Sequence, residues 1–410
     1  MALTARHLGE LFDWPLALAA LGLVVAGWVG LLSATGATAA SRMQGLASVQ
    51  LLWVAFAFCA ALAALWLPVR FWYGIAYIVY GVTLALLVLT LFYGARWMGA
   101  ERWLVLGPIR IQASELGKVG LILALSRYLA NHKVTMTRLS HFLGALAITL
   151  VPVALIRQQP DLGTAAVYLA IFLPMVYWAG LKNLHLFVLV VPIVNAICAF
   201  AGWIPWMAFC LAFVGLLFLI RPPVLWTVLL VVVNLTIGII TPAIWDRLEP
   251  FQQRRIQTFF SPEKDPLGAG YQIIQSQVAI GSGGMTGKGF QQGSQTQLAY
   301  LPETHTDFIF AVLGEEWGFV GTLAVVGLLL LLVWRTIRMG LVTNNRFASF
   351  VCIGIGSMIA FQSVVNIGMT LGLMPVTGLP LPLVSYGGSA TITVGFALGL
   401  VLSFGLRGYE

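Results

Sequence analysis

Charged residues are scarce in this chain: they make up 9% of 410 residues, against about 25% in an ordinary soluble protein. Hydrophobic residues make up 60%. Several apolar runs without an interior charge reach the roughly 20 residues that a helix needs to cross a bilayer. This excludes a soluble globular protein and predicts an all-α polytopic membrane protein folded as one transmembrane domain over residues 1–410.

Cysteine is scarce as well. The chain has four cysteines, and none belongs to a CxxC pair: Cys59, Cys198, Cys210 and Cys352. All four lie inside apolar runs, so we interpret them as small hydrophobic side chains rather than as metal ligands or disulfide partners. The net charge of +8 is assigned to the cytoplasmic ends of helices, and no nucleic-acid partner is expected.

Nucleotide-binding motifs are missing from the glycine-rich segment 281–289. A phosphate loop ending at Lys288 needs glycine at position 282, which is Ser282, and a Ser or Thr where Gly289 stands. A dinucleotide pattern starting at Gly281 fails at Thr286. We therefore expect no nucleotide cofactor. The segment is either a flexible turn or a backbone-amide site for a lipid-linked diphosphate.

Apolar runs between polar breaks predict a bundle of about 12 transmembrane helices. The runs are 14–34, 46–67, 73–93, 114–130, 140–157, 162–180, 184–201, 203–220, 224–243, 307–334, 347–372 and 386–406. The Lys and Arg residues outside the long 244–306 connection are unevenly divided between the two sides of the membrane. Eleven lie at helix ends on the same side as the N-terminus, and five lie in the short loops on the other side. The positive-inside rule then places both termini in the cytoplasm and makes 244–306 a large extracytoplasmic loop.

Ionisable residues at the outer ends of two predicted spans are candidates for function, because a charge in the bilayer costs about 2.5–3.5 kcal/mol on insertion scales. Glu115 and Lys118 lie three residues apart on one helical face, and Asp161 begins the span at 162–180. They could be a structural ion pair and a helix N-cap. Alternatively, the three residues line one polar cavity that opens outward and binds an anionic headgroup.

Short sequence blocks carry a resemblance to a known family. They are 102–104 with Gly107, 114–118, 159–164, 265–271, 275–276, 279–284, 287–289, 301–310, 315–316, 366–368 and 380–389. In this order and across most of the chain, they resemble the SEDS family (shape, elongation, division and sporulation proteins), most closely its RodA branch. Asp265-Pro266-Leu267-Gly268 and Gly287-Lys288-Gly289 carry the likeness to that branch.

The resemblance implies a peptidoglycan glycosyltransferase that polymerises lipid II at the outer face of the bacterial cytoplasmic (inner) membrane during elongation and rod-shape maintenance. It implies that Asp265 is the catalytic residue, and a carboxylate suits a general base for a sugar hydroxyl. The leaving diphosphate needs positive charge, for which Arg102, Lys118 and Lys288 are candidates, as is Mg²⁺ or Mn²⁺ held near Glu115 and Asp161.

The resemblance also implies partners: lipid II, the nascent glycan strand, a class B penicillin-binding protein acting as transpeptidase, and other proteins of the elongation complex. Gly395 and Gly399 in the last span could dock a partner helix or pack internally. Two features depart from the family pattern. Ala113 stands where the family commonly has proline, and the family usually has ten spans, so we expect 184–220 to be an inserted helical hairpin.

Three alternatives remain open at this point. An FtsW-like septal polymerase would share the same blocks. A lipid II flippase or other transporter would need its polar residues near the bilayer midplane, whereas here nearly all lie at the outer ends of spans. A non-catalytic scaffold would tolerate changes in the loop around Asp265.

Overall fold

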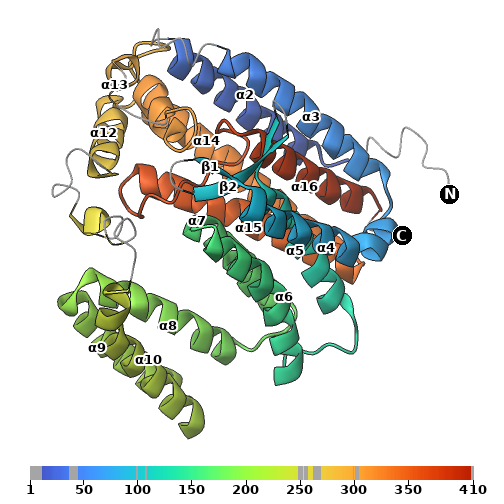
Figure 1. Ribbon diagram of the computed structural model, residues 1–410, viewed down its shortest axis with the longest axis vertical. Helices are drawn as coiled ribbons and strands as arrows, with labels where there is room; N and C mark the ends of the chain where they lie inside the picture. The colour runs from blue at the N-terminus through green and yellow to red at the C-terminus, as the bar shows by residue number, and fades with distance from the viewer. Residues whose placement is uncertain are drawn as a thin grey trace. The chain divides into compact units, whose positions relative to one another are not determined.

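The computed structural model describes residues 12–36, 45–97, 100–106, 109–247, 253, 257–261, 269–298, 300 and 304–407. The chain divides into two compact units, the first formed by Met1–Ala179 with Gln272–Glu410 and the second by Gly180–Tyr271. Helices dominate both units (Figure 1).

Long helices build the first unit: α2 (Trp14–Gly36), α3 (Leu46–Trp66), α4 (Val69–Tyr93), α5 (Ala113–Ala130), α6 (Leu139–Gln158), α7 (Leu162–Trp178), α14 (Ile309–Val342), α15 (Arg346–Thr370) and α16 (Gly388–Arg407). The short helix α13 (Ser294–Gln297) and most of α12 (Ala269–Ser282) also belong to it. The second unit contains α8 (Asn183–Ala201), α9 (Trp203–Ile220) and α10 (Val224–Trp245).

Among the described residues, ten helices are long and apolar enough to cross a membrane. The polytopic all-helical prediction is confirmed at this level. Each of the 12 predicted runs lies on a helix, but α5 and α7 are not among the ten. The reason is local: α5 carries Glu115, Lys118 and Arg127, and α7 has only 17 residues.

The chain between α4 and α5, to which the sequence analysis assigned no secondary structure, contains strands. It forms a three-stranded antiparallel sheet from β1 (Ala95–Trp97), β2 (Ala100–Leu106) and β3 (Ile109–Ile111), in the order β1-β2-β3. The Gly107-Pro108 pair between two short apolar stretches is a turn signal that could have predicted the β2–β3 hairpin.

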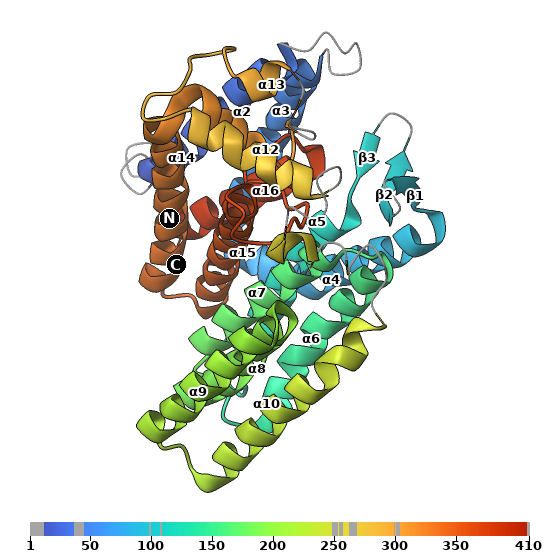
Figure 2. The same ribbon diagram turned by 90° about the vertical axis from the view of Figure 1, so that its left-hand side faces the viewer.

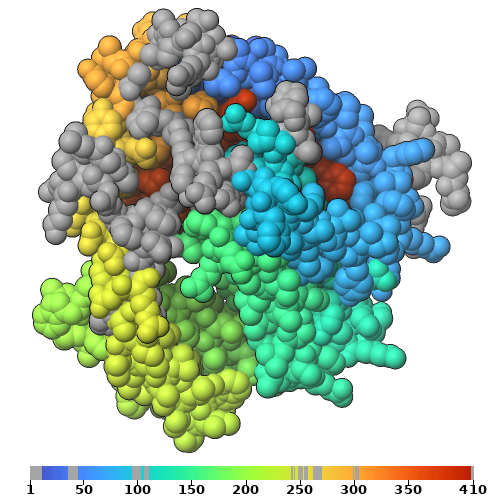
Figure 3. All heavy atoms as spheres, viewed as in Figure 1, coloured from blue at the N-terminus to red at the C-terminus, as the bar shows by residue number. Residues whose placement is uncertain are grey.

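Helix α15 lies at the centre of the first unit (Figure 2). In the most apolar 18-residue stretch of α15, 78% of the residues are buried, compared with 67% in the corresponding stretch of α16, 22% in that of α4 and 17% in that of α3. On the face drawn in Figure 3, little of α15 and α16 is visible, and much of the surface belongs to α3 and α4. The outer helices therefore present apolar side chains to lipid, while α5, α15 and α16 form the interior of the first unit.

Helix α16 packs closely on α3 through its glycines. A Cβ at Gly395 would lie 2.9 Å from the Ala57 carbonyl oxygen, and one at Gly399 would overlap that of Ala61. Small residues let two membrane helices approach to backbone contact. Of the two alternatives for these glycines, internal packing is therefore the correct one.

Basic side chains gather at the end of the first unit where α5 ends and α15 begins. Arg335 forms a bidentate ion pair with the buried Asp13, with an Nη2–Oδ2 distance of 2.8 Å. Arg346 Nη1 lies 2.9 Å from His132 Nδ1. The sequence contains no Asp or Glu in 66–100, 116–160 or 317–407. This end thus has the charge distribution expected of a cytoplasmic face.

In the described part of the second unit, the long helices are α8, α9 and α10. Helices α8 and α9 form the predicted hairpin and turn at Gly202, whose φ of 129° favours glycine. The unit has a small apolar core of Val191, Phe213 and Leu230. Beside it, Asn195 Nδ2 donates to the Asn234 carbonyl oxygen at 2.7 Å. That this hairpin is an insertion relative to the family stays a prediction.

Candidate functional site

Several of the sequence blocks meet at the end of the first unit where α5, α7 and α14 begin. The backbone N–H of Gln112 donates to Ser389 Oγ at 3.0 Å, which joins the start of α5 to the start of α16. Asn366 Nδ2 donates to the carbonyl oxygens of Asp307 and Leu379 at 3.0 and 2.8 Å. Blocks that lie far apart in sequence therefore form one polar region.

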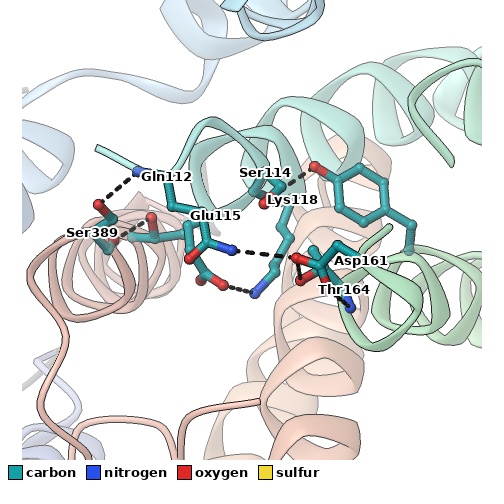
Figure 4. A network of polar contacts seen from close by, with 9 residues as sticks. Gln112, Ser114, Glu115, Lys118, Asp161, Thr164 and Ser389 are labelled. Atoms are coloured by element: carbon teal, nitrogen blue, oxygen red, sulfur yellow. Dashed lines mark hydrogen bonds and ion pairs between the residues drawn. The ribbon is translucent and has the colours of Figure 1, made fainter. Parts of the chain in front are cut away.

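Glu115 and Lys118 form a buried ion pair in the first turns of α5 (Figure 4). Lys118 Nζ lies 2.6 Å from Glu115 Oε1, and the two residues are 0% and 2% exposed. The i, i+3 spacing places both side chains on one face, as predicted. A buried charge is tolerated only when it is neutralised, so each side chain depends on the other.

Asp161 is the N-cap of α7. Its Oδ1 accepts from the Thr164 backbone N–H at 3.1 Å, and its Oδ2 accepts from Thr164 Oγ1 at 2.9 Å. Gln112 Nε2 lies 3.5 Å from the same Oδ2. Figure 4 shows Gln112, Glu115, Lys118 and Asp161 with their side chains pointing toward one another. The structure thus brings together the three ionisable residues selected from the sequence.

Close packing between α5 and α7 supports this cluster. The Tyr168 hydroxyl donates to the Ser114 carbonyl oxygen at 2.9 Å, and a Cβ at Gly117 would overlap that hydroxyl oxygen. A Cβ at Gly163 would lie 2.7 Å from the Thr377 carbonyl oxygen. These glycines let α5, α7 and the 371–387 connection approach closely enough for the polar side chains to meet.

The cluster holds two carboxylates against one ammonium. Carboxylate oxygens are ligands that Mg²⁺ and Mn²⁺ prefer, and Mg²⁺ commonly binds through one or two of them while keeping waters or substrate phosphates. The described residues contain no group of three or more His, Cys, Asp or Glu side chains arranged to hold a metal. Within the described residues, Glu115 and Asp161 are therefore the two carboxylates that this cluster could offer to a cation.

Of the other predicted site residues, the structure describes the side chain of Lys288 alone, and it lies outside this cluster. Lys288 belongs to a separate group, where its Nζ donates to Glu315 Oε1 at 2.8 Å and to Ser294 Oγ at 2.7 Å. Arg102 lies in β2, and its side chain is outside what the structure describes. Asp265 falls within 262–268, which lies outside the described residues.

Sequence reasoning missed the roles of Gln112, Ser389, Asn366 and Glu315. Gln112 and Ser389 are 277 positions apart, and Asn366 and Asp307 are 59 apart. Helical spacing predicts only neighbours within one or two turns. The available signal was that all four residues lie in or beside the blocks that carry the family resemblance.

A family model described as cell cycle protein, named for FtsW, RodA and SpoVE, matches residues 13–209 and 205–406. The chain belongs to this FtsW/RodA/SpoVE family. Curated family members include the peptidoglycan glycosyltransferase RodA of Treponema pallidum, which is 39% identical over 352 residues that cover 78% of this chain and 81% of that protein. The peptidoglycan glycosyltransferase MrdB of Escherichia coli is 37% identical over 337 residues, covering 82% and 79%.

An FtsW-named relative matches almost as well. The probable peptidoglycan glycosyltransferase FtsW of Idiomarina loihiensis is 33% identical over 400 residues, covering 96% of this chain and 86% of that protein. The identities to the two branches are too similar to assign the chain to RodA or FtsW.

Solved structures confirm the RodA-like fold. A chain from a study of polymerization and crosslinking by a peptidoglycan synthase complex has a TM-score of 0.70 at 33% identity, with 97% of this chain and 99% of that chain covered. The rod shape determining protein RodA of Thermus thermophilus has a TM-score of 0.65 at 30% identity, covering 97% and 98%.

Proposed function

We propose that this family member polymerises lipid II into glycan strands at the outer face of the bacterial cytoplasmic membrane. The chain is a peptidoglycan glycosyltransferase, as its curated relatives are. The observation that carries the proposal is the buried group of Glu115, Lys118 and Asp161 at the end of the bundle where the family's sequence blocks meet. Because this group has two carboxylates against one ammonium, it would receive an anionic diphosphate headgroup together with a divalent cation or a further basic side chain.

In the proposed reaction, Asp265 takes the proton of an acceptor sugar hydroxyl. The hydroxyl oxygen attacks the anomeric carbon of the donor, and the bond from that carbon to the diphosphate oxygen breaks. Undecaprenyl diphosphate leaves with the bonding electrons. Lys118, with Arg102, would bind the negative charge that develops on the leaving group, while Glu115 holds the Lys118 ammonium in place.

A divalent cation fits this scheme as a further source of positive charge. Bound by Glu115 and Asp161, Mg²⁺ or Mn²⁺ would act as a Lewis acid toward the diphosphate. The residues of this chain would orient the headgroup through Lys118 and Gln112, whose side chains already point into the cluster.

We assign the chain to elongation, with a class B penicillin-binding protein as its transpeptidase partner and other elongation proteins around it. The RodA-like blocks support this choice, as does the similarity to a chain from a peptidoglycan synthase complex. An FtsW-like septal role is the second candidate, supported by the long match to an FtsW-named relative. A flippase is less well supported, because Glu115 and Asp161 lie in the first turn and at the N-cap of their helices and not near midspan.

Purified protein supplied with lipid II is expected to form glycan polymer, and chelation of divalent cations should slow the reaction about tenfold or more, with recovery on adding Mg²⁺ or Mn²⁺. Product length can be followed on gels after labelling the glycan. Failure to form polymer with or without cations would contradict the proposed function. If the rate is unchanged after chelation, the cation has no part in the mechanism. Lys118 and Arg102 would then supply the positive charge that stabilises the leaving diphosphate.

The topology can be tested with single cysteines in a variant lacking the four native ones. Gln292→Cys and Asn344→Cys place exposed thiols at opposite ends of the first unit. We expect an impermeant maleimide to label Gln292→Cys in intact spheroplasts, and Asn344→Cys only after the membrane is opened, because the basic end should face the cytoplasm. The reverse pattern would place the site on the inner face and exclude lipid II polymerisation there.

A further inference from the structure

Helix α14 is interrupted near its beginning. Gly318 has φ 65° and ψ −160°, which is not a helical conformation. A break of this kind frees backbone N–H and C=O groups that must be paired again inside a membrane protein. The glycine-rich segment 283–289 pairs with them through hydrogen bonds.

We call this backbone junction between 283–289 and 314–320 the stitch. Four main-chain hydrogen bonds form it: Lys288 N to Glu315 O at 3.0 Å, Gly289 N to Glu316 O at 3.0 Å, Phe319 N to Gly284 O at 2.9 Å and Val320 N to Met285 O at 3.1 Å. Donors and acceptors come from both segments, as between neighbouring β-strands. The interrupted helix therefore keeps its backbone groups satisfied through a loop.

The glycines of this segment are needed for the close approach. A Cβ at Gly283 would overlap the Gly314 carbonyl oxygen, and one at Gly287, whose φ is 80°, would overlap the Glu316 carbonyl oxygen. The glycine cluster is thus neither a flexible turn nor a cradle of free amides. Its amides at Lys288 and Gly289 are already occupied by α14.

A single ion pair secures the stitch. Glu315 is 0% exposed, and its carboxylate accepts from Lys288 Nζ at 2.8 Å and from the Gln295 and Thr296 backbone N–H groups at 2.9 and 3.2 Å. Ser294 Oγ and Thr296 Oγ1 also donate to it. Lys288 is the only cation among these donors, so its loss would leave a buried carboxylate uncompensated.

The stitch connects two elements of the first unit that carry the family's sequence blocks, α12 and α14. On one side it directly follows α12, which begins at Ala269, four residues after Asp265. Along α12, Ser276 Oγ donates to the Thr370 carbonyl oxygen at 2.7 Å. On the other side, α14 begins at Ile309, directly after the turn whose Asp307 carbonyl oxygen accepts from Asn366. Movement of the stitch would therefore displace both.

We propose that the Lys288–Glu315 pair is a positioning element of the polymerase: it holds the stitch closed and thereby fixes the part of α12 from Gln272 onward and the start of α14, at the end of the first unit where the polar cluster lies. The inference rests on the proposed function. In it, Lys288 acts on Glu315 and not on a diphosphate, and neither residue needs to contact substrate.

The test uses a cysteine-free background, in which Lys288→Met is expected to slow lipid II polymerisation about 100-fold while lipid II binding is retained, because small displacements of catalytic groups cost about that much. Lys133→Met, which removes an exposed lysine at the opposite end, is the matched control and should keep the parental rate. Adding Met285→Cys with Val320→Cys, at a hydrogen-bonded pair of the stitch, should form a disulfide that restores polymerisation to Lys288→Met and is reversed by reductant.

Hydrogen exchange provides a readout that does not depend on catalysis. Amides of 284–296 should exchange faster in Lys288→Met and return to the parental rate once the disulfide forms. Unchanged exchange in Lys288→Met would overturn the proposal. So would a slow enzyme whose stitch is demonstrably closed by the disulfide, because Lys288 would then act on the substrate itself. If the parental protein makes no polymer, the proposed function fails, while the exchange data still decide whether the pair holds the stitch.

Discussion

Asp265→Asn is expected to lower the rate of lipid II polymerisation by about 100- to 10,000-fold, the usual contribution of a general base. Asparagine has nearly the same size as aspartate but cannot take a proton from the acceptor hydroxyl. Folding and lipid II binding should therefore stay close to parental values. The measurements are initial rates with purified protein and, separately, retention of labelled lipid II.

The matched control for this variant is Glu263→Gln, which removes a carboxylate two residues away in the same loop. It should polymerise lipid II at the parental rate. If Asp265→Asn does so as well, the general-base assignment is wrong and the loop has a scaffold or gating role. If both variants lose activity equally, the charge of the loop matters and not the chemistry of one carboxylate.

Lys118→Met is expected to destabilise the folded protein by about 3–5 kcal/mol, because it leaves the buried Glu115 carboxylate without its cation. The double variant Glu115→Gln with Lys118→Met removes both charges and should recover most of that stability. Thermal unfolding in detergent distinguishes the two cases. Both variants should lose polymerisation, since the proposed headgroup site needs the ammonium.

Other outcomes of these measurements would show whether the Glu115–Lys118 pair has a structural or a catalytic role. If the double variant recovers both stability and polymerisation, Glu115 and Lys118 form a purely structural ion pair. If Lys118→Met unfolds no more easily than the parental protein, water or another group compensates Glu115, and the pair is less isolated than its burial implies.

The sequence predicted best what depends on neighbours along the chain. The apolar runs marked the helices, the three-residue spacing marked the Glu115–Lys118 pair, and Asp161 ahead of Gly163 and Thr164 marked a helix N-cap. Each of these follows from helical geometry within one or two turns. The three residues do lie together, and that they line an outward cavity or act in catalysis stays a prediction.

Contacts between distant segments could not be predicted in this way. Nothing in the spacing of Lys288 and Gly289 indicates that the partners of their backbone N–H groups lie in α14, 27 positions along the chain. The break at Gly318 lay inside the predicted span 307–334, since hydropathy does not register one residue with a positive φ. The sheet at 95–111 was missed because a search for spans passes over short strands.

The stitch also limits how the chain can change in length. Surface loops usually accept insertions and deletions, because their backbone groups are paired with water. Between Gly284 and Gly289, two carbonyl oxygens and two backbone N–H groups each bond to a specific residue of α14. One added residue would shift the register of these bonds and leave backbone polar groups at the helix break without hydrogen-bond partners. This stretch should therefore keep a fixed number of residues, as a paired β-strand does, although it lies in a long connection between membrane helices.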